Sequence, residues 1–305
     1  MEIVVGKMAG FCGGVRNAVD KTYEEAKKVN GTIYCLGDLV HNPVVLKNLE
    51  KLGVKIINNL EEIEKPNGKT VIVRAHGIAK EIYEQAESLN ITLKDLTCPK
   101  VLKIHCFAEE HAKNDDYILL VGERKHPEVI GTKSFCGENS IVIENEEELK
   151  EALEKIKTKL NENKNISKNN SNTSSQKLAL IAQTTFNLEK FKKFENIIAN
   201  ELEDYIDIVV NNTICDATRL RQDETENLSK TVDGMIIIGG RKSSNTNKLY
   251  QISLANCKNT IMVEDETELE NELSKFKNCN KIGIMAGAST PKETIDKVLE
   301  IIEKI

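Results

Sequence analysis

The chain has 305 residues, of which 40% are hydrophobic and 30% charged, so its composition excludes wholesale disorder and allows a sizeable core. At roughly 150 residues per domain, this length suggests two domains, with one or three also compatible. The 42 basic and 48 acidic residues give a net charge of −6, which argues against a general nucleic-acid-binding surface. The lack of Trp and an aromatic content of 4% argue against a platform for base stacking.

The N-terminus lacks the basic segment and long apolar stretch of a secretory signal. No apolar run approaches the roughly 20 residues that cross a bilayer. We therefore expect a cytoplasmic protein without a membrane or nucleic-acid partner. In that compartment the 8 Cys are expected to be reduced thiols or metal ligands and not a disulfide scaffold.

Short apolar runs rich in β-branched residues alternate with amphipathic stretches along the chain. This alternation predicts parallel α/β sheets covered by helices. An apolar run, a loop with Cys or His and a helix recur, which suggests two or three similar α/β units. The expected strands are Ile3–Val5, Ile33–Leu36, Thr70–Val73, Ile91–Leu93, Tyr117–Val121, Ile141–Ile143, Leu178–Ala182, Ile206–Val210, Met235–Ile238, Ile261–Val263 and Ile282–Met285. The expected helices include Gly14–Val29, Pro43–Leu52, Glu81–Leu89, Pro99–His111, Glu146–Leu160, Leu188–Glu203 and Arg219–Thr231.

Two local segments carry their own signals. Residues 161–176 are almost entirely Asn, Lys, Ser, Glu and Thr, so we expect an exposed, mobile loop inserted within one domain. Near the C-terminus, Thr290, Pro291 and Glu293 form a capping-box pattern ahead of a helix with apolar residues at helical spacing. We therefore expect Thr290 to cap that last helix.

Chemically useful side chains follow these strands and lie ahead of helices. Because ligands of open α/β sheets bind beyond the carboxyl ends of the strands, we predict one shared polar cavity. These residues are, in chain order, Cys12, His41, His76, Cys98, His126, Glu128, Thr184, Cys215, Ser243, Ser244, Asn245 and Ser289.

The three cysteines of this set, Cys12, Cys98 and Cys215, are separated by 86 and 117 residues. This spacing fits neither a zinc knuckle nor a ferredoxin run. Thiolates at helix N-termini are nevertheless stabilised by the helix dipole, and three of them could hold an iron–sulfur cluster with one iron left open. The alternative is that they are ordinary buried thiols. A zinc site from His105, Cys106 and Cys136 is a further alternative.

The histidines and small polar residues favour an anion. Imidazoles donate hydrogen bonds to phosphate, and the free N–H groups at helix starts attract it. The alternatives are structural histidines and, for the serines and the asparagine, plain helix capping. Arg74, Arg124 and Lys125 either add positive charge to the cavity or lie on the solvated surface.

Nine fragments in order resemble the LytB/IspH family, the 4-hydroxy-3-methylbut-2-enyl diphosphate reductases of the non-mevalonate isoprenoid pathway. They are GFCGGV, LGDLVHNP, VIVRAHG, DLTCP, HPEVIG, AQTT, NTICDAT, SSNT and AGASTP, spread over residues 10–291. The resemblance implies three similar α/β lobes in a pseudo-threefold arrangement around a central [4Fe–4S] cluster. We expect these lobes at 13–97, at 98–214 with the 161–176 loop, and at 215–305 with 1–12.

The resemblance also implies roles for the strand-end residues. Cys12, Cys98 and Cys215 would ligate one cluster per chain and leave one iron open. Glu128 would deliver protons and Thr184 would bind the substrate hydroxyl. The diphosphate would lie among the remaining strand-end side chains, which are His41, His76, His126, Ser243, Ser244, Asn245 and Ser289.

The implied reaction is reductive dehydroxylation of the allylic diphosphate to isopentenyl and dimethylallyl diphosphate. Gly239-Gly240 lacks the spacing of a dinucleotide fingerprint, so we expect a ferredoxin or flavodoxin to donate the electrons. One rival is an iron–sulfur sensor or electron carrier, which would need no polar pocket. The other is a metal-dependent phosphohydrolase, which would need His and Asp clustered at metal spacing.

Overall fold

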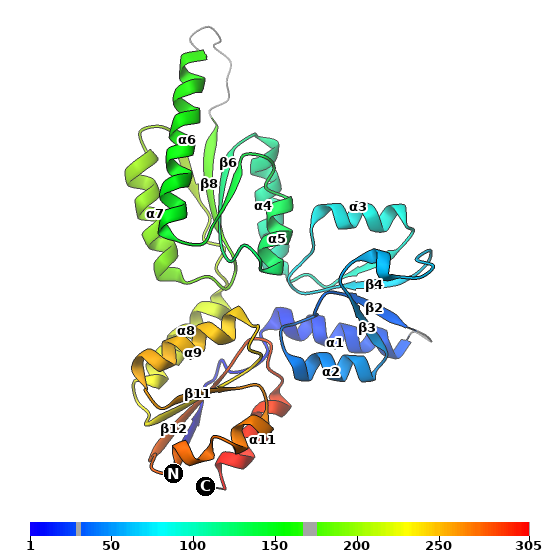
Figure 1. The fold of residues 1–305 in the computed structure, drawn as a ribbon, viewed down its shortest axis with the longest axis vertical. Helices are drawn as coiled ribbons and strands as arrows, with labels where there is room; N and C mark the ends of the chain where they lie inside the picture. Colours follow the sequence, from blue (N-terminus) through cyan, green and yellow to red (C-terminus); the bar gives the residue numbers. More distant parts are fainter. Residues whose placement is uncertain (29–31, 167–175, 305) are drawn as a thin grey trace. The chain divides into compact units, whose positions relative to one another are not determined.

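The structure is a computed structural model that describes residues 1–28, 32–166 and 176–304, without the side chains of 163–166. Within these ranges, twelve strands form three sheets of four strands each, and every pair of neighbouring strands is parallel (Figure 1). The predicted fold class, an α/β protein of three similar lobes, is confirmed. The exact lobe boundaries stay a prediction.

The chain divides into two compact units. Unit 1 comprises Met1–Ala75, Leu89–Cys98 and Asp216–Ile305, and unit 2 comprises His76–Ser88 and Pro99–Cys215. Sheet A of unit 1 has the order β1 (Glu2–Val5), β12 (Lys281–Ala286), β10 (Gly234–Ile238), β11 (Thr260–Val263). Sheet B of unit 1 has the order β3 (Val54–Ile57), β2 (Ile33–Leu36), β4 (Thr70–Val73), β5 (Thr92–Asp95). Sheet C of unit 2 has the order β7 (Ser140–Ile143), β6 (Tyr117–Val121), β8 (Lys177–Ala182), β9 (Asp207–Val210).

All three sheets have the same strand order. Sheets B and C run second, first, third, fourth in chain order, and sheet A follows the same pattern with the N-terminal β1 in the fourth place. The chain order reverses between the first and third strands, and such a switch point is where open α/β sheets bind ligands. The recurrence seen in the sequence therefore reflects one topology used three times.

Helices connect and cover these strands. None of the helices in the described ranges has the length and apolarity that crossing a membrane would require. They are α1 (Gly13–Lys28), α2 (Pro43–Lys51), α3 (Lys80–Ser88), α4 (Pro99–Lys113), α5 (Pro127–Ser134), α6 (Glu146–Ile166), α7 (Leu188–Leu202), α8 (Asp216–Ser229), α9 (Ser244–Asn256), α10 (Glu266–Glu270) and α11 (Lys292–Ile302), with short 3-10 turns at Leu60–Glu62 and Leu273–Phe276.

Sheet C is covered on both faces, which explains why its strands are apolar without alternation. Successive residues of β6 point to opposite faces: Leu119 packs in the cluster that α6 and α7 complete, and Ile118 and Leu120 pack in the cluster that α4 and α5 complete. Figure 1 shows these helix pairs on the two sides of β6 and β8. Each face of this sheet thus carries its own hydrophobic core.

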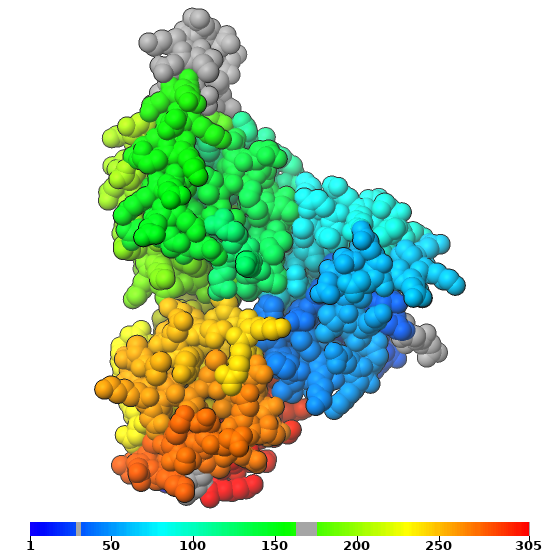
Figure 2. Space-filling model, viewed as in Figure 1, coloured from blue at the N-terminus to red at the C-terminus, as the bar shows by residue number. Residues whose placement is uncertain are grey.

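The helix α6 shows how the sequence produces an amphipathic surface helix. Leu149, Leu153, Ile156 and Leu160 are buried at helical spacing, and most of the Lys and Glu residues between them are exposed. This part of the chain is green in Figure 2. The helix continues to Ile166, so the prediction that the loop begins at residue 161 is wrong. Asn, Lys and Glu can all continue a helix for another turn. Residues 167–175 of the predicted loop lie outside the described residues.

In unit 1, sheet A has a core on each face, and one face of sheet B packs against α1 and α2. The expected cap of the last helix is not formed. Pro291 occupies the N-cap of α11 without a side-chain hydrogen bond, and the buried Thr290 Oγ1 donates instead to the Ile238 carbonyl at 3.0 Å. A contact with a strand distant in sequence has therefore replaced the local capping box.

After its fourth strand, each sheet passes the chain to a helix that packs elsewhere. From sheet A the chain enters α1, whose Ala18 and Val19 pack on sheet B. From sheet B it enters α4, whose Ile104 packs on sheet C. From sheet C it enters α8, whose Leu228 packs on sheet A. These three crossover connections are topologically equivalent.

Candidate functional site

Each crossover connection carries one of the three predicted thiols. Cys12 lies between β1 and α1, Cys98 between β5 and α4, and Cys215 between β9 and α8. Each cysteine is the residue directly before its helix, where the unpaired N–H groups and the helix dipole stabilise a thiolate. All three are free thiols and partly exposed. The structure thus places one comparable thiol at the same position of each sheet.

The two thiols of unit 1 are held by their backbones and by a close glycine. The Cys12 N–H donates to the Ala288 carbonyl at 3.2 Å, and the Cys98 N–H donates to the Ala75 carbonyl at 3.0 Å. A Cβ added to Gly14 would lie 2.6 Å from Cys98 Sγ. Only a glycine therefore allows the first turn of α1 to approach the Cys98 thiol this closely.

In unit 2 the third thiol is tied to a predicted substrate residue. The Cys215 N–H donates to the Thr184 carbonyl at 3.0 Å. Thr184 follows β8, the third strand of sheet C, and Cys215 follows β9, the fourth. Neighbouring parallel strands therefore bring a thiol and a hydroxyl residue to the same edge of this sheet.

The remaining cysteines have other environments. Cys35 and Cys136 are buried, burial raises the pKa of each thiol to about 12, and each thiol donates to a nearby carbonyl. Burial also raises the pKa of the Cys279 thiol. Cys257 is buried at the end of α9, and Cys106 is exposed on α4. The three partly exposed loop thiols are thus set apart from five cysteines in packing or surface environments.

The most constrained polar contact of unit 2 joins Glu128 to Thr184. Glu128 Oε1 accepts the Thr184 N–H at 2.6 Å, and Thr184 Oγ1 and Glu128 Oε2 lie 2.7 Å apart. Glu128 is in the first turn of α5 yet is only 2% exposed, so it is not a solvated helix-start residue. Burial raises the pKa of Glu128 to about 7, although the hydrogen bonds from Thr184 act in the opposite direction. The carboxyl can therefore gain and lose a proton near neutral pH.

His126 and His76 lie beside this pair in the same unit. His126 is the N-cap of α5, and its Nδ1 accepts the Glu128 N–H at 3.1 Å. Pro127 at the first helical position restricts the backbone of His126, as the sequence suggests. An Nδ1 that accepts leaves the proton on Nε2 in the neutral ring. The His76 ring packs edge-on against the His126 ring at 5.4 Å.

In unit 1, loops from sheets A and B meet at His41. Ser289 Oγ donates to the His41 carbonyl at 3.4 Å. A Cβ on Gly240 would lie 2.3 Å from the same carbonyl oxygen, so a glycine is needed for this approach. His41 and Ser289 come from the first strand of sheet B and the third strand of sheet A. Two predicted substrate residues are thereby brought together, which no local pattern indicated.

The serine and asparagine residues at the start of α9 have different roles. Ser243 is the N-cap, and its Oγ accepts the Thr246 N–H at 3.3 Å, so the capping alternative holds for this residue. Ser244 is the first residue of the helix. Asn245 is only 4% exposed, and neither atom of its amide has a hydrogen-bond partner among the described residues. A buried amide of this kind is suited to a polar ligand.

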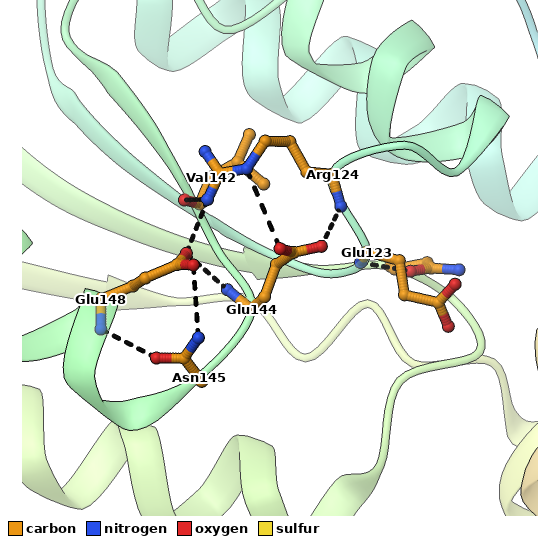
Figure 3. Close-up of polar contacts among 7 residues, drawn as sticks. Glu123, Arg124, Val142, Glu144, Asn145 and Glu148 are labelled. Carbon is orange, nitrogen blue, oxygen red and sulfur yellow. Dashed lines mark hydrogen bonds and ion pairs between the residues drawn. The ribbon is translucent and has the colours of Figure 1, made fainter.

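For three basic residues, the sequence allows a place either in the cavity or on the solvated surface. Arg124 lies on the surface with its side chain 52% exposed. Its guanidinium pairs with Glu148 at 2.6 Å, and its backbone N–H donates to the Glu144 carboxylate (Figure 3). Lys125 is exposed. Arg74 is partly buried and packs over Gly37, where a Cβ would lie 2.2 Å from its Nη1. Burial lowers the pKa of this guanidinium, opposed by the charge of Asp38. Of the three, Arg74 alone is partly buried, and it lies against the loop that follows the first strand of sheet B.

The alternative zinc site is not formed. The His105 ring stacks on Phe135 at 4.4 Å, Cys106 points from the exposed side of α4, and the Cys136 thiol donates to the Thr132 carbonyl. Within the described ranges, these three residues do not form a group within metal-ligating distance.

Taken by sheet, the site residues define a class of protein. It is a three-sheet α/β protein with a thiol beyond each fourth strand and with His, Glu, Thr, Ser or Asn side chains beyond the first and third strands. A family model described as LytB protein matches residues 3–303. The chain belongs to the LytB family.

Individual relatives agree with this assignment. The chain is 38% identical over 309 residues to the 4-hydroxy-3-methylbut-2-enyl diphosphate reductase of Clostridioides difficile, and the match covers 100% of both. A solved structure of (E)-4-hydroxy-3-methyl-but-2-enyl diphosphate reductase, described as the terminal enzyme of the non-mevalonate pathway, is 37% identical with a TM-score of 0.68 and full coverage of both chains. That of the E-1-hydroxy-2-methyl-but-2-enyl-4-diphosphate reductase from Plasmodium falciparum is 28% identical, with a TM-score of 0.83 over 98% of this chain and 87% of that one.

Proposed function

We propose that this protein is a 4-hydroxy-3-methylbut-2-enyl diphosphate reductase, the last enzyme of the non-mevalonate isoprenoid pathway. Two electrons and two protons convert the allylic alcohol to isopentenyl or dimethylallyl diphosphate and one water. The observation that carries the proposal is the occurrence of one partly exposed thiol at the same crossover position of all three sheets. The relatives that match over the whole chain bear the same name.

The donor set fits a [4Fe–4S] cluster. Cys12, Cys98 and Cys215 are free thiols at helix starts, and Gly14 leaves room beside the Cys98 sulfur that a Cβ would fill. These three would hold the cluster and leave one iron open. When bound, the cluster supplies single electrons and a Lewis-acidic iron, which no side chain can provide.

The chain itself supplies the proton that goes to the leaving hydroxyl. With a pKa of about 7, the Glu128 carboxyl carries a proton in a large share of molecules at neutral pH. In that state Oε2 donates to Thr184 Oγ1, and the Thr184 hydroxyl is free to donate its own proton to the substrate oxygen. When Glu128 is ionised, the same hydrogen bond runs from Thr184 to Glu128. This pair can therefore deliver a proton to the leaving hydroxyl as the carbon–oxygen bond breaks, and so form water.

The diphosphate requires neutral and cationic donors, which the remaining site residues provide. His126 presents Nε2–H, because its Nδ1 accepts the Glu128 N–H. Asn245 offers a buried amide, and Ser244 and Asn245 belong to the N-terminal turn of α9, whose N–H groups attract anions. We assign the diphosphate to these residues together with the others that follow first and third strands: His41, His76, Ser243 and Ser289.

Electrons would come from a small donor protein, a ferredoxin or a flavodoxin. The decisive experiment is anaerobic purification with iron and sulfide analysis, a visible spectrum, and turnover of synthetic substrate with a chemical reductant. We expect a brown protein with about four irons per chain that forms both products. A colourless, zinc-loaded protein without turnover would overturn the proposal and favour the phosphohydrolase alternative.

A further inference from the structure

The loop that leads to Cys12 depends on two side chains of a helix distant in sequence. The strand β1 ends at Val5, and α1 begins at Gly13. Between them, Glu224 of α8 accepts two successive backbone N–H groups: Oε1 accepts from Lys7 and Oε2 from Met8, both at 2.7 Å. One carboxylate therefore accepts hydrogen bonds from two backbone N–H groups that lie outside the strand pairing of sheet A.

Arg221 binds the carbonyls of the same loop. Its Nε donates to the Met8 carbonyl and its Nη2 to the Gly10 carbonyl, each at 2.8 Å. Nη1 donates to the Ala217 carbonyl within α8 at 3.2 Å. The guanidinium is only 1% exposed, and a buried cation is tolerated only when its donors are satisfied. The planar fork of Arg can reach two loop carbonyls at once, which the single ammonium of Lys cannot reproduce.

Glu224 thus accepts the backbone N–H groups of the loop and Arg221 donates to its carbonyl groups, so the two side chains together fix the loop. They lie three residues apart on α8 and so share one face of that helix. Gly10 adopts a φ of +94°, which lets the chain turn between the two contacts and Cys12. The same helix begins at Asp216, the residue after Cys215. The element that starts beside one proposed ligand thus holds the loop that carries another.

We infer that Arg221 and Glu224 are positioning residues that hold the Cys12 thiol in place for the cluster. The inference rests on the proposed function for its consequence, because it supposes that Cys12 is a ligand. The tether itself is a property of the loop and can be tested without the cluster. Groups that orient metal ligands usually matter for affinity nearly as much as the ligands themselves.

The test compares Arg221→Gln, Arg221→Lys and Glu224→Gln with Arg219→Gln, a change on the same helix at a residue that pairs with Asp223 on the surface at 3.0 Å. In the full chain without cluster, alkylation by iodoacetamide is followed by mass spectrometry at Cys12 and Cys98. We expect faster alkylation of Cys12 in the Gln variants, with Cys98 unchanged. A merely destabilised protein would instead expose both thiols.

In the anaerobically reconstituted protein, the readouts are iron retained against a chelator and the electron paramagnetic resonance spectrum of the reduced cluster. We expect the Gln variants to lose iron about tenfold faster, at the low end of effects on ligand-orienting groups, and to show an altered spectrum. Arg221→Lys should retain iron better than Arg221→Gln but less well than the parent, and Arg219→Gln should retain iron as the parent does. Because Glu224→Gln keeps one acceptor, it covers the case in which Arg221→Gln does not fold.

The two proposals can fail separately. If the parent takes up no cluster while Cys12 alkylation responds as expected, the tether stands and the proposed function fails. If the parent binds the cluster while the Gln variants match it in alkylation ratio, iron retention and spectrum, the positioning role of Arg221 and Glu224 is overturned.

Discussion

At the scale of single residues, environment separates two glutamates that follow strands of the same sheet. Glu144 follows β7 on the surface, where it accepts the Arg124 N–H beside Glu148 (Figure 3). Glu128 follows β6 within the first turn of α5, buried against Thr184. Water solvates the surface carboxyl of Glu144, whereas burial raises the pKa of the Glu128 carboxyl to about 7. Of these two glutamates, we propose Glu128 as the proton donor.

Replacing Glu128 with Gln should abolish most turnover while the cluster and substrate binding are retained. Gln keeps the shape and can still accept the Thr184 N–H, but it has no transferable proton. Loss of a positioned general acid costs about 10²- to 10⁴-fold in rate. The measurement is turnover and iron content on one anaerobic sample.

Glu144→Gln is the matched control, since it changes a carboxyl on the same sheet that lies on the surface. It should retain normal turnover. Near-normal turnover of Glu128→Gln would eliminate this residue as the proton source. Low turnover accompanied by lost iron would make its role structural.

The raised pKa of Glu128 also predicts a pH profile. An acid must be protonated to donate, so with a pKa of about 7 the proton-donating form is present below that pH and is lost above it. Turnover under saturating substrate and reductant should therefore fall above about pH 7, approaching tenfold per unit. The residual turnover of Glu128→Gln should lack this limb. A parent profile that stays flat up to pH 9 would contradict the assignment.

The three crossover thiols should respond alike to substitution. Cys12→Ser, Cys98→Ser and Cys215→Ser are each expected to remove turnover and to lower bound iron, because an alcohol is a poor ligand for iron–sulfur clusters. Cys257→Ser and Cys279→Ser should leave both largely intact, since these thiols belong to the packing of sheet A. Iron analysis decides the matter, and a full complement in Cys98→Ser would refute its assignment as a ligand.

At the scale of elements, local patterns predict most strands because parallel strands buried on both faces are continuous apolar runs. The strand β3 (Val54–Ile57) was not predicted. It is an edge strand with an exposed Lys55, and it starts directly after the α2 helix through Gly53 at a φ of +83°, without a polar loop to announce it. The Thr290 cap was wrong because a local capping pattern does not reveal the contact of Thr290 with Ile238, 52 residues away. The start of the loop at 161 was wrong because a polar composition does not by itself end a helix.

The candidate residues could be found in the sequence because they follow strands, but their contacts could not. The Glu128–Thr184 pair spans 56 residues, and the Ser289 contact to the His41 carbonyl spans 248. Residues this far apart in sequence meet because the switch point of each sheet brings strand ends together. Glycines, as at Gly240, also allow a second backbone to approach closely. Arg221 and Glu224 had no signal at all, since their partners are backbone groups of a distant loop.

Two adjacent glycines give a test of how an element approaches the site. A Cβ at Gly14 would lie 2.6 Å from Cys98 Sγ, whereas a Cβ at Gly13 has no heavy atom within 4 Å. Both occupy the first turn of α1, so Ala changes their helix propensity similarly. We expect Gly14→Ala to displace the Cys98 thiol and lower iron content, and Gly13→Ala to retain it. Equal iron content in the two variants would show that the close approach is not required.

At the scale of the whole molecule, three sheets share a topology but not a chemistry. The residues beyond their first strands are His41 in sheet B, His126 with Glu128 in sheet C, and Ser243 to Asn245 in sheet A. A buried carboxyl thus follows only the first strand of sheet C among these three positions. The repeated fold provides equivalent attachment points, and we propose that the residues at these points serve either proton delivery or anion binding.

The separate hydrophobic cores of the three sheets, together with the proposed open iron, predict how the molecule responds to oxygen. Each sheet has its own hydrophobic core, so the proposed cluster is not what holds the sheets together internally. An open iron is accessible to oxidants, and its loss would remove the substrate site. We therefore expect air to abolish turnover and bound iron while the far-ultraviolet circular dichroism spectrum stays that of an α/β protein.

Anaerobic reconstitution with iron and sulfide should restore turnover, and saturating substrate during exposure should slow the loss by mass action. Turnover unchanged after prolonged exposure would argue against an open iron, and collapse of the dichroism spectrum would show that the cluster also holds the fold.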